Sequence, residues 1–251
     1  MKFSVCVESV FDGCDFAESM KEIKNAGIDT IEFWTWDNKN IEAIKSEKES
    51  LGINIAGFCT KYFNLVNPDN REQYLSGLKE SIEIAKRLNV TKLITQVGDE
   101  IKDVSREAHN KSIIDGLKAC APILEESGVT LLAEPLNTFV DHIGYYLYSS
   151  GECAEIIRTV NSPNVKMLFD IYHQQIMEGN LISNITKYFD CIGHFHAAGN
   201  PGRNEIYKGE INYKNIFEAI DSLGYKGFMG LEYFTKENPT QTIKDILSYL
   251  S

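Results

Sequence analysis

The sequence of 251 residues lacks the features that mark several large classes of protein. No stretch approaches the roughly 18 apolar residues of a membrane span. Glu8, Asp12 and Asp15 interrupt the apolar start, so we expect no secretory signal. Lysine and arginine number 25 against 36 aspartates and glutamates, a formal charge of −11 that argues against nucleic acid as the main partner. We therefore expect a cytoplasmic protein with no membrane and no nucleic-acid partner.

Cysteine is sparse and scattered. The six cysteines form no CxxC pair, so zinc-ribbon and redox-motif interpretations have no support. Reduced, mostly buried thiols are the expectation for such a pattern in the cytoplasm. Hydrophobic residues make up 43% and charged residues 24%, close to an ordinary globular protein, and no low-complexity or linker segment divides the chain.

Short apolar runs alternate with amphipathic stretches eight times along the chain. Helices are predicted at 15–25, 41–51, 70–88, 105–128, 150–160, 178–189, 213–223 and 239–250. Strands are predicted at 3–7, 28–33, 53–58, 90–97, 129–133, 165–169, 191–195 and 228–231. The strands are continuous apolar runs, which indicates burial on both faces, as in a parallel sheet.

Eight strand–helix units in about 250 residues are typical of a (β/α)8 barrel. A doubly wound open sheet is the competing architecture, and it usually carries a glycine-rich loop after its first strand. Here the first strand is followed by the residues Glu-Ser-Val-Phe-Asp at 8–12. The sequence therefore predicts an α/β fold, a TIM barrel that forms one domain over residues 1–251.

Polar side chains follow four successive strands at the point where each strand ends. They are Glu134, Asp170, His196 and Glu232. Any one of them could cap a helix or pair with a surface lysine. Four together, each directly after an apolar run, favour a shared site at the end of the barrel where catalytic residues gather. Three carboxylates with one imidazole suit Mn²⁺ or Mg²⁺ and could accept Co²⁺ or Zn²⁺.

Other candidates have both a structural and a functional interpretation. His173, just past the sixth strand, could belong to a helix cap or donate to a substrate oxygen. Arg203 lies on the turn-rich loop 200–205 and could carry a cation over the barrel mouth or remain a surface residue. Residues that could wall the pocket or pack elsewhere are Trp34, Trp36 and the three tyrosines of loop 141–148.

The remaining polar residues receive simpler predictions. Glu32 and Gln96 lie near the ends of the second and fourth strands. His194 is two residues before His196 and faces the same side, so it is predicted to lie deeper in the barrel or to support the ligand from behind. His109, among charged residues on a helix, is predicted to be exposed to solvent.

The second half of the chain resembles hydroxypyruvate isomerases, within the xylose isomerase-like barrel superfamily of sugar isomerases and epimerases. The resemblance covers residues 129–233 and is carried by VTLLAEPLNT, IGYYL, MLFDIYHQQIMEGNL, IGHFHAAGNPGRNE, GEINY and GYKGFMGLEY. Over the first 128 residues only the strand–helix rhythm and FSVCVESVF agree well.

The resemblance implies roles for the candidate residues. Glu134 and Glu232 would both bind a divalent metal and perform acid–base chemistry, with Asp170 as a third ligand. His173 and Arg203 would bind substrate oxygens. The fourth ligand position is glutamine in hydroxypyruvate isomerases, within a GHIQ-like segment, whereas this chain has GHFH with histidine at 196, as the ketose 3-epimerases do.

The implied activity is metal-dependent isomerisation of a small hydroxy-keto acid, such as hydroxypyruvate to tartronate semialdehyde, through an enediolate. A ketose 3-epimerase, a 2-oxo-tetronate isomerase and a non-catalytic sugar-binding barrel are the alternatives. The stretch EIYKGEINY matches the isomerases better than the epimerases. A barrel nuclease acting on abasic DNA would need more ligands than five histidines allow and a basic face. The partner is thus a small keto acid or sugar, and a homo-oligomer remains open.

Overall fold

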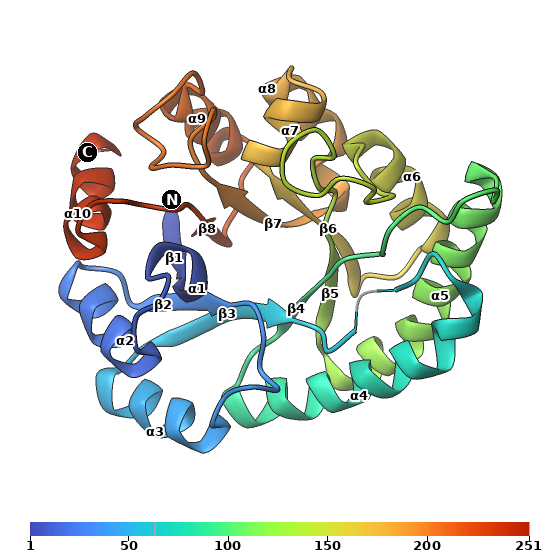
Figure 1. Cartoon of the computed structure of the whole chain (residues 1–251), viewed down its shortest axis with the longest axis horizontal. Coiled ribbons are helices and arrows are strands. Elements are labelled where there is room, and N and C mark those ends of the chain that lie inside the picture. The colour runs from blue at the N-terminus through green and yellow to red at the C-terminus, as the bar shows by residue number, and fades with distance from the viewer. Residues whose placement is uncertain (63, 251) are drawn as a thin grey trace.

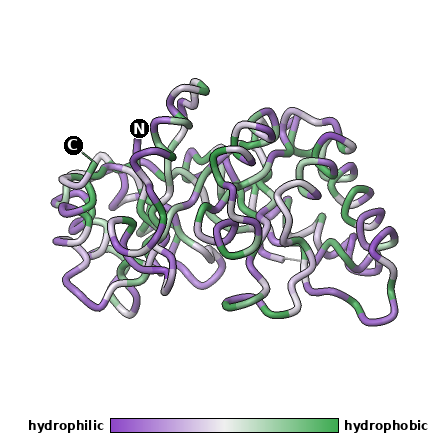
Figure 2. The backbone as a smooth tube through the Cα atoms, turned by 90° about the horizontal axis from the view of Figure 1, so that it is seen from above, coloured by the Kyte–Doolittle hydropathy of each residue, from purple (hydrophilic) through white to green (hydrophobic). Residues whose placement is uncertain are grey.

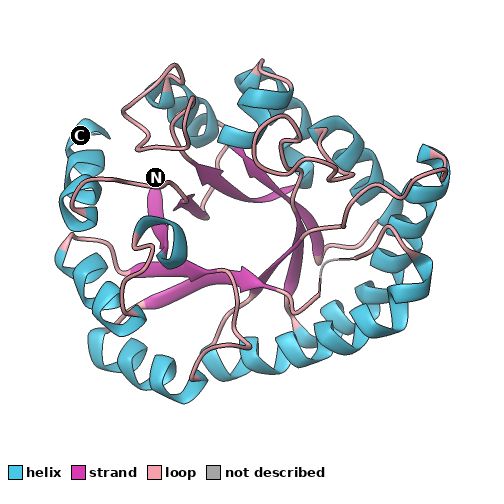
Figure 3. Ribbon diagram, in the orientation of Figure 1, coloured by secondary structure: helices cyan, strands magenta, loops and turns pink. Residues whose placement is uncertain are grey.

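In the computed structural model, which describes residues 1–62 and 64–250, eight strands close into a barrel (Figures 1 and 3). Every neighbouring pair is parallel, including β1 with β8. The strands are β1 (Lys2–Cys6), β2 (Thr30–Phe33), β3 (Asn54–Cys59), β4 (Lys92–Thr95), β5 (Thr130–Ala133), β6 (Val165–Asp170), β7 (Ile192–Ala197) and β8 (Phe228–Leu231). The predicted (β/α)8 TIM barrel is confirmed.

The helices are α1 (Val7–Val10), α2 (Phe16–Asn25), α3 (Ile41–Leu51), α4 (Arg71–Leu88), α5 (Arg106–Ser127), α6 (Ser150–Val160), α7 (Ile171–Met177), α8 (Leu181–Tyr188), α9 (Tyr213–Ser222) and α10 (Pro239–Leu250), with short 3₁₀ turns η1 (Pro68–Asn70) and η2 (Phe189–Cys191). Most of them surround the barrel on the outside, whereas the short α1 lies beside β1 and β2 (Figures 1 and 3). Within the described part of the chain, none of them is both long and apolar enough to cross a membrane.

Local sequence signals set most helix boundaries. Side chains of Asp15, Asn40, Ser105 and Ser149 accept a hydrogen bond from the backbone of the first turn of α2, α3, α5 and α6. Such caps satisfy backbone N–H groups that have no partner inside the helix. At the other end, Gly52 and Gly128 adopt the left-handed conformation that closes α3 and α5.

Two short helices were not predicted from the sequence. α1 and α7 begin directly at the ends of β1 and β6, with no intervening loop. The helix predicted within 178–189 is α8, which η2 follows. Glu178, Gly179 and Asn180 separate α8 from α7, and the last two of them have positive φ. Because the apolar runs continue from strand into helix, hydrophobic periodicity gave no signal at either junction.

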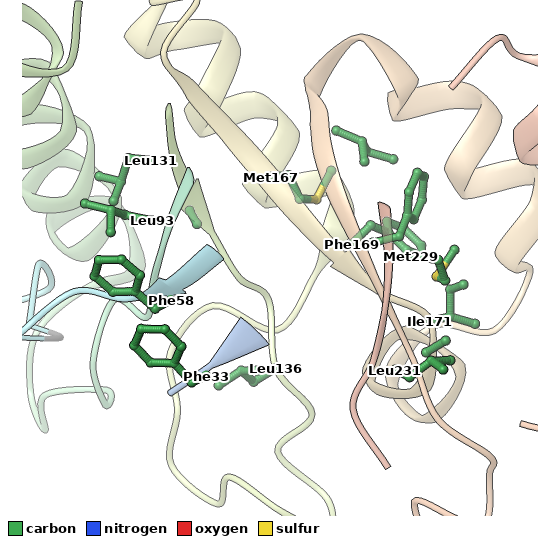
Figure 4. Packing of buried hydrophobic residues seen from close by; sticks show 14 of the residues in the cluster. Phe33, Phe58, Leu93, Leu131, Leu136, Met167, Phe169, Ile171, Met229 and Leu231 are labelled. Carbon is green, nitrogen blue, oxygen red and sulfur yellow. The ribbon is translucent and has the colours of Figure 1, made fainter. Parts of the chain in front are cut away.

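The hydrophobic core has two layers. The larger one lies between the barrel and the helices, where Phe33 and Phe58 stack with ring centroids 5.0 Å apart (Figure 4). Hydrophilic and hydrophobic segments alternate along the outer helices, as expected of helices that bury one face (Figure 2). A small inner layer fills part of the barrel interior and comprises Cys59, Ile94, Leu132 and Leu168.

The six cysteines fit the expectation of mostly buried thiols. All six are free, Cys14 is exposed and the other five are buried. Burial raises the pKa of the Cys6 and Cys59 thiols well above the usual value, aided by nearby glutamates, so these groups stay protonated.

The barrel mouth is held by backbone hydrogen bonds that extend past the strands. The Glu134 amide donates to the Thr95 carbonyl over 3.1 Å, and the Glu232 amide donates to the Ala197 carbonyl over 3.1 Å. The hydroxyl of buried Tyr145 accepts from the Val97 amide and donates to the Glu134 carbonyl, both over 2.9 Å. Tyr145 thus ties the end of β4 to the residue that follows β5.

We predict that Tyr145→Phe destabilises the protein, because it leaves two buried backbone groups without a partner. The free energy of unfolding, measured by urea denaturation, should fall by about 1–3 kcal/mol. Tyr249→Phe is the matched control, since Tyr249 lies partly exposed on α10 against Tyr207, and it should change stability by less than about 0.5 kcal/mol. Equal stability of the Tyr145→Phe variant and the wild type would contradict this role.

Candidate active site

The barrel brings together the four residues predicted at the strand ends. Glu134, Asp170, His196 and Glu232 each offer one ligand atom, and these atoms all lie within 4.8 Å of one another. They come from the ends of β5 to β8, and all four side chains are buried. Strand pairing sets the neighbours, because Asp170 is in register with His196, which is in register with Gly230 of β8.

Several atoms of this cluster have no hydrogen-bond partner among the described residues. They are Glu134 Oε1, Asp170 Oδ2 and His196 Nδ1. His196 Nδ1 is 3.8 Å from Glu134 Oε1 and 3.3 Å from Glu232 Oε2. Buried polar atoms are nearly always paired, so three unpaired ligand atoms that face each other need a compensating group. A divalent cation fits this donor set of three carboxylates and one imidazole.

Burial and mutual repulsion shape the charges of the cluster. Burial and the neighbouring Glu232 carboxylate raise the pKa of Glu134 to about 8. Burial alone would also raise the pKa of Glu232, but Arg203 and His196 outweigh it and lower this pKa well below the usual range. Burial raises the pKa of Asp170 despite the nearby Arg203. A cation bound among these carboxylates would favour their ionised form.

Asp170 serves two neighbours at once. Its Oδ1 accepts from the backbone amide of His173 over 3.1 Å and caps α7. Its Oδ2 is left for the cluster and lies 3.7 Å from His173 Nε2. The cap therefore fixes the carboxylate with one oxygen aimed into the site.

His173 is held as a neutral donor. The backbone amide of Asn137 donates to His173 Nδ1 over 3.2 Å, and the Asn137 side-chain nitrogen lies 2.7 Å from the same atom. A backbone N–H can only donate, so Nδ1 is the acceptor and the ring proton resides on Nε2. Burial and Arg203 lower the pKa of His173 well below its usual value. Its Nε2–H is buried, has no hydrogen-bond partner within the residues that the structure describes, and is available to a ligand oxygen.

Arg203 reaches the cluster from the loop after β7. Its Nη2 donates to Glu232 Oε2 over 2.6 Å. The guanidinium carbon lies 5.5 Å from the centroid of the Tyr172 ring and 5.7 Å from that of the Phe234 ring. Its Nε is buried and has no hydrogen-bond partner among the described residues, so one donor of the guanidinium is not used by Glu232.

A cavity of about 260 Å³ opens beside the cluster. Glu134, His173, His196, Arg203 and Glu232 line it, whereas Asp170 lies fully buried behind them. Of the aromatic residues considered as walls, Trp34 lines the cavity, and its Nε1 donates to Glu232 Oε1 over 2.6 Å. Trp36 instead donates to Ser81 on α4, and Tyr145 and Tyr146 are buried in packing.

Some predictions about single residues were wrong or incomplete. His109 is not exposed but fully buried: its Nε2 accepts from the Ile101 amide over 3.0 Å, and its ring stacks on Tyr146. The segment before α5 folds over this histidine, which helix periodicity does not register. His142 was not singled out from the sequence, yet it lines the cavity 5.3 Å from the ring of His173. Only its place two residues before Gly144, on the loop after the fifth strand, hinted at this.

The closed parallel barrel and the cluster at the C-terminal ends of its strands define a TIM-barrel protein with a candidate divalent-metal centre. Comparison with known proteins then gives the family. A family model described as "Xylose isomerase-like TIM barrel" matches residues 20–251. The chain belongs to the xylose isomerase-like TIM barrel family.

Named relatives cover nearly the whole chain. A hydroxypyruvate isomerase from Escherichia coli (strain K12) is 29% identical over 241 residues, 93% of this chain and 93% of that protein. A 2-oxo-tetronate isomerase from Pectobacterium atrosepticum is 26% identical over 256 residues, 99% of this chain and 96% of that protein. A crystal structure of an AP endonuclease, family 2, from Brucella melitensis has a TM-score of 0.93 at 25% identity, and the match covers 99% of this chain and 98% of that one.

We predict that Asp170→Asn weakens divalent-metal binding while the fold is kept. Asparagine still caps α7, so the change removes mainly one ligand charge. The loss of Mn²⁺ affinity, measured by equilibrium dialysis, should exceed the roughly 10- to 100-fold that removal of an outer-shell partner costs. Wild-type affinity in a folded Asp170→Asn protein would contradict the site as drawn.

Proposed function

We propose that this protein is a metal-dependent isomerase of a small hydroxy-keto acid, and that it interconverts hydroxypyruvate and tartronate semialdehyde or a close homologue. The observation that carries the proposal is the pair of glutamates directly after β5 and β8, whose carboxylate oxygens lie 3.8 Å (Glu134) and 3.3 Å (Glu232) from His196 Nδ1. The names of the two relatives, both isomerases of small keto acids, support the same class.

Glu134, Asp170, His196 and Glu232 would hold the cation. When bound, a divalent cation supplies Lewis acidity, which makes the C–H bond beside a carbonyl more acidic. The choice between Mn²⁺ and Mg²⁺, or Co²⁺ and Zn²⁺, follows from metal supply as much as from this ligand set.

Glu134 and Glu232 would move the carbon-bound proton. One carboxylate removes a proton from C3 of hydroxypyruvate; the C–H electrons form a C2–C3 double bond and the carbonyl electrons move to O2, which gives an enediolate. The other carboxylate, or the same one, delivers a proton to C2. The hydroxyl proton leaves O3, which becomes the aldehyde oxygen, and O2 gains a proton. A positioned general acid–base contributes about 10²- to 10⁴-fold to such a transfer.

The two cationic or donor groups beside the cavity would orient the substrate. His173 presents Nε2–H, which can donate to a substrate oxygen without changing its own charge. Arg203 presents Nε–H beside its contact with Glu232, which suits a substrate carboxylate. The pairing of Arg203 with Glu232 also couples carboxylate recognition to one of the two acid–base groups.

The size of the cavity favours a small substrate. About 260 Å³ is below the roughly 300–1,000 Å³ of common small-molecule pockets. A three- or four-carbon acid fits this limit better than a six-carbon ketose, although His196 matches the ketose 3-epimerases. A 2-oxo-tetronate, one carbon longer than hydroxypyruvate, remains the nearest alternative, and it uses the same acid–base steps.

Two other functions have less support. A nuclease acting on abasic DNA would share the fold of the Brucella protein, but a chain with a net charge of −11 would repel the DNA backbone. A non-catalytic binding barrel has no need for two buried glutamates beside unpaired ligand atoms. Isomerisation accounts for the two buried glutamates, which move the proton, and for the ligand atoms, which hold the metal.

We predict that Arg203→Lys lowers kcat/KM for hydroxypyruvate more than for dihydroxyacetone, a neutral ketose of the same length. Lysine keeps the charge but loses the donor at Nε. The kcat/KM for hydroxypyruvate should fall roughly 10- to 100-fold further than that for dihydroxyacetone, in line with one lost charge-assisted hydrogen bond. An effect that acts only through Glu232 would lower kcat/KM for the two substrates equally. An equal loss for both substrates would show that Arg203 does not read a carboxylate.

We predict that Glu134→Gln and Glu232→Gln each lower turnover by about 10²- to 10⁴-fold, since glutamine keeps a ligating oxygen but removes the base. Exchange of substrate protons with deuterated solvent, followed by NMR, separates the two roles. A variant that exchanges the substrate proton but makes no product has lost the group that acts in the second step. Wild-type turnover in both variants would show that neither glutamate is the base.

A further inference from the structure

A second buried polar group lies inside the barrel next to the candidate metal cluster. It consists of Glu32 on β2, His194 on β7 and the shared ligand His196, whose ligand atoms also lie within 4.8 Å of one another. The side chains of all three are nearly inaccessible to solvent. Glu32 does not line the cavity, so it cannot touch a substrate there.

Three side chains make hydrogen-bond contacts with the carboxylate of Glu32. His194 Nε2 lies 2.9 Å from Oε1, and His196 Nε2 lies 2.9 Å from Oε2. The hydroxyl of Ser4 also donates to Oε1. Each of the two carboxylate oxygens thus lies within hydrogen-bond distance of an imidazole Nε2. A carboxylate oxygen accepts hydrogen bonds, so the two Nε2–H groups are the donors in these contacts.

The contact with Glu32 decides which ring nitrogen of His196 faces the cluster. Because Nε2 donates to Glu32, Nδ1 is the nitrogen left toward Glu134 and Glu232, and it has no hydrogen-bond partner within residues 1–62 and 64–250. Gly230 on β8 makes room for this arrangement. A Cβ atom there would lie 2.5 Å from His196 Cδ2 and 2.8 Å from Glu32 Oε1.

We infer that Glu32 is a positioning residue that holds the Nε2–H of His196 and so presents Nδ1 to the metal. The inference rests on the metal site proposed above. A carboxylate behind a ligating imidazole fixes the tautomer and the ring plane and makes the other nitrogen a stronger donor. His194 and Ser4 in turn hold Glu32. The four side chains thus form a chain of hydrogen bonds inside the barrel that ends at the proposed ligand His196.

Glu32→Gln tests the inference, since an amide of the same size can accept from only one of the two imidazoles. Mn²⁺ affinity, measured by calorimetry on the purified full chain, should fall by roughly 10- to 100-fold. Ser112→Ala is the control: it removes a buried side-chain hydrogen bond, from Ser112 on α5 to the Leu65 carbonyl, that lies outside this group, so its Mn²⁺ affinity should stay close to that of the wild type. A Glu32→Gln protein that binds Mn²⁺ as tightly as the wild type overturns the inference.

A double-mutant cycle separates positioning from a merely structural role. In a His196→Gln background there is no imidazole to orient, so the additional Glu32→Gln change should cost little further Mn²⁺ affinity. A further loss as large as that in the wild-type background would mean that Glu32 supports the site in another way, and it would overturn the inference.

Nitrogen-15 NMR of the wild-type protein loaded with diamagnetic Zn²⁺ requires no variant to fold. The expected spectrum has a protonated Nε2 and a metal-bound Nδ1 for His196. A metal-bound Nε2 would overturn the inference but leave the proposed isomerase intact. If the wild type bound neither Mn²⁺ nor Zn²⁺, the proposed function itself would fail, and this inference would fail with it.

Discussion

The burial of four carboxylates at one end of a single barrel is the constraint on which the rest of this structure depends. Each needs compensation, because an isolated buried charge is strongly unfavourable. Glu32 receives it from two imidazoles and a hydroxyl, and Glu232 from Arg203 and an indole. Glu134 and Asp170 each keep one buried oxygen that has no hydrogen-bond partner in the described part of the chain. The protein supplies every compensating group except the one that these two oxygens share, and a divalent cation is the group of matching charge.

The scaffold around this cluster places side chains by rigid means. Parallel pairing sets Asp170 beside His196, and ladder bonds beyond the strands fix the backbone of Glu134 and Glu232. Helix capping leaves one oxygen of Asp170 free for the cluster. A backbone amide selects the tautomer of His173. A precise site requires side chains that are held rigidly in place. Here backbone hydrogen bonds and strand pairing hold several of them.

The barrel and the four clustered residues could be predicted from the sequence because both leave local signals in it. Continuous apolar runs predict buried parallel strands, and a carboxylate or imidazole directly after such a run predicts a place at the mouth. The role of Glu32 could not be predicted in this way, because its partner His196 is 164 residues away on β7. The burial of His109 and the approach of His142 depend on how loops fold over the barrel, which periodicity does not encode. The start of α7 was missed for a different reason: Asp170 ends a strand and caps a helix at the same position.

We propose that this buried cluster isomerises a small keto acid only when a divalent metal is bound. The most direct measurement is proton NMR of hydroxypyruvate in deuterated water with chelator-stripped protein, before and after addition of Mg²⁺. We expect no reaction before addition, and afterwards tartronate semialdehyde with deuterium at C2, together with deuterium at C3 of the remaining hydroxypyruvate. Equal conversion by the stripped and the Mg²⁺-loaded protein would show that the metal is not required. A Mg²⁺-loaded protein that neither converts hydroxypyruvate nor exchanges its protons would show that the cluster is not an isomerase of this acid.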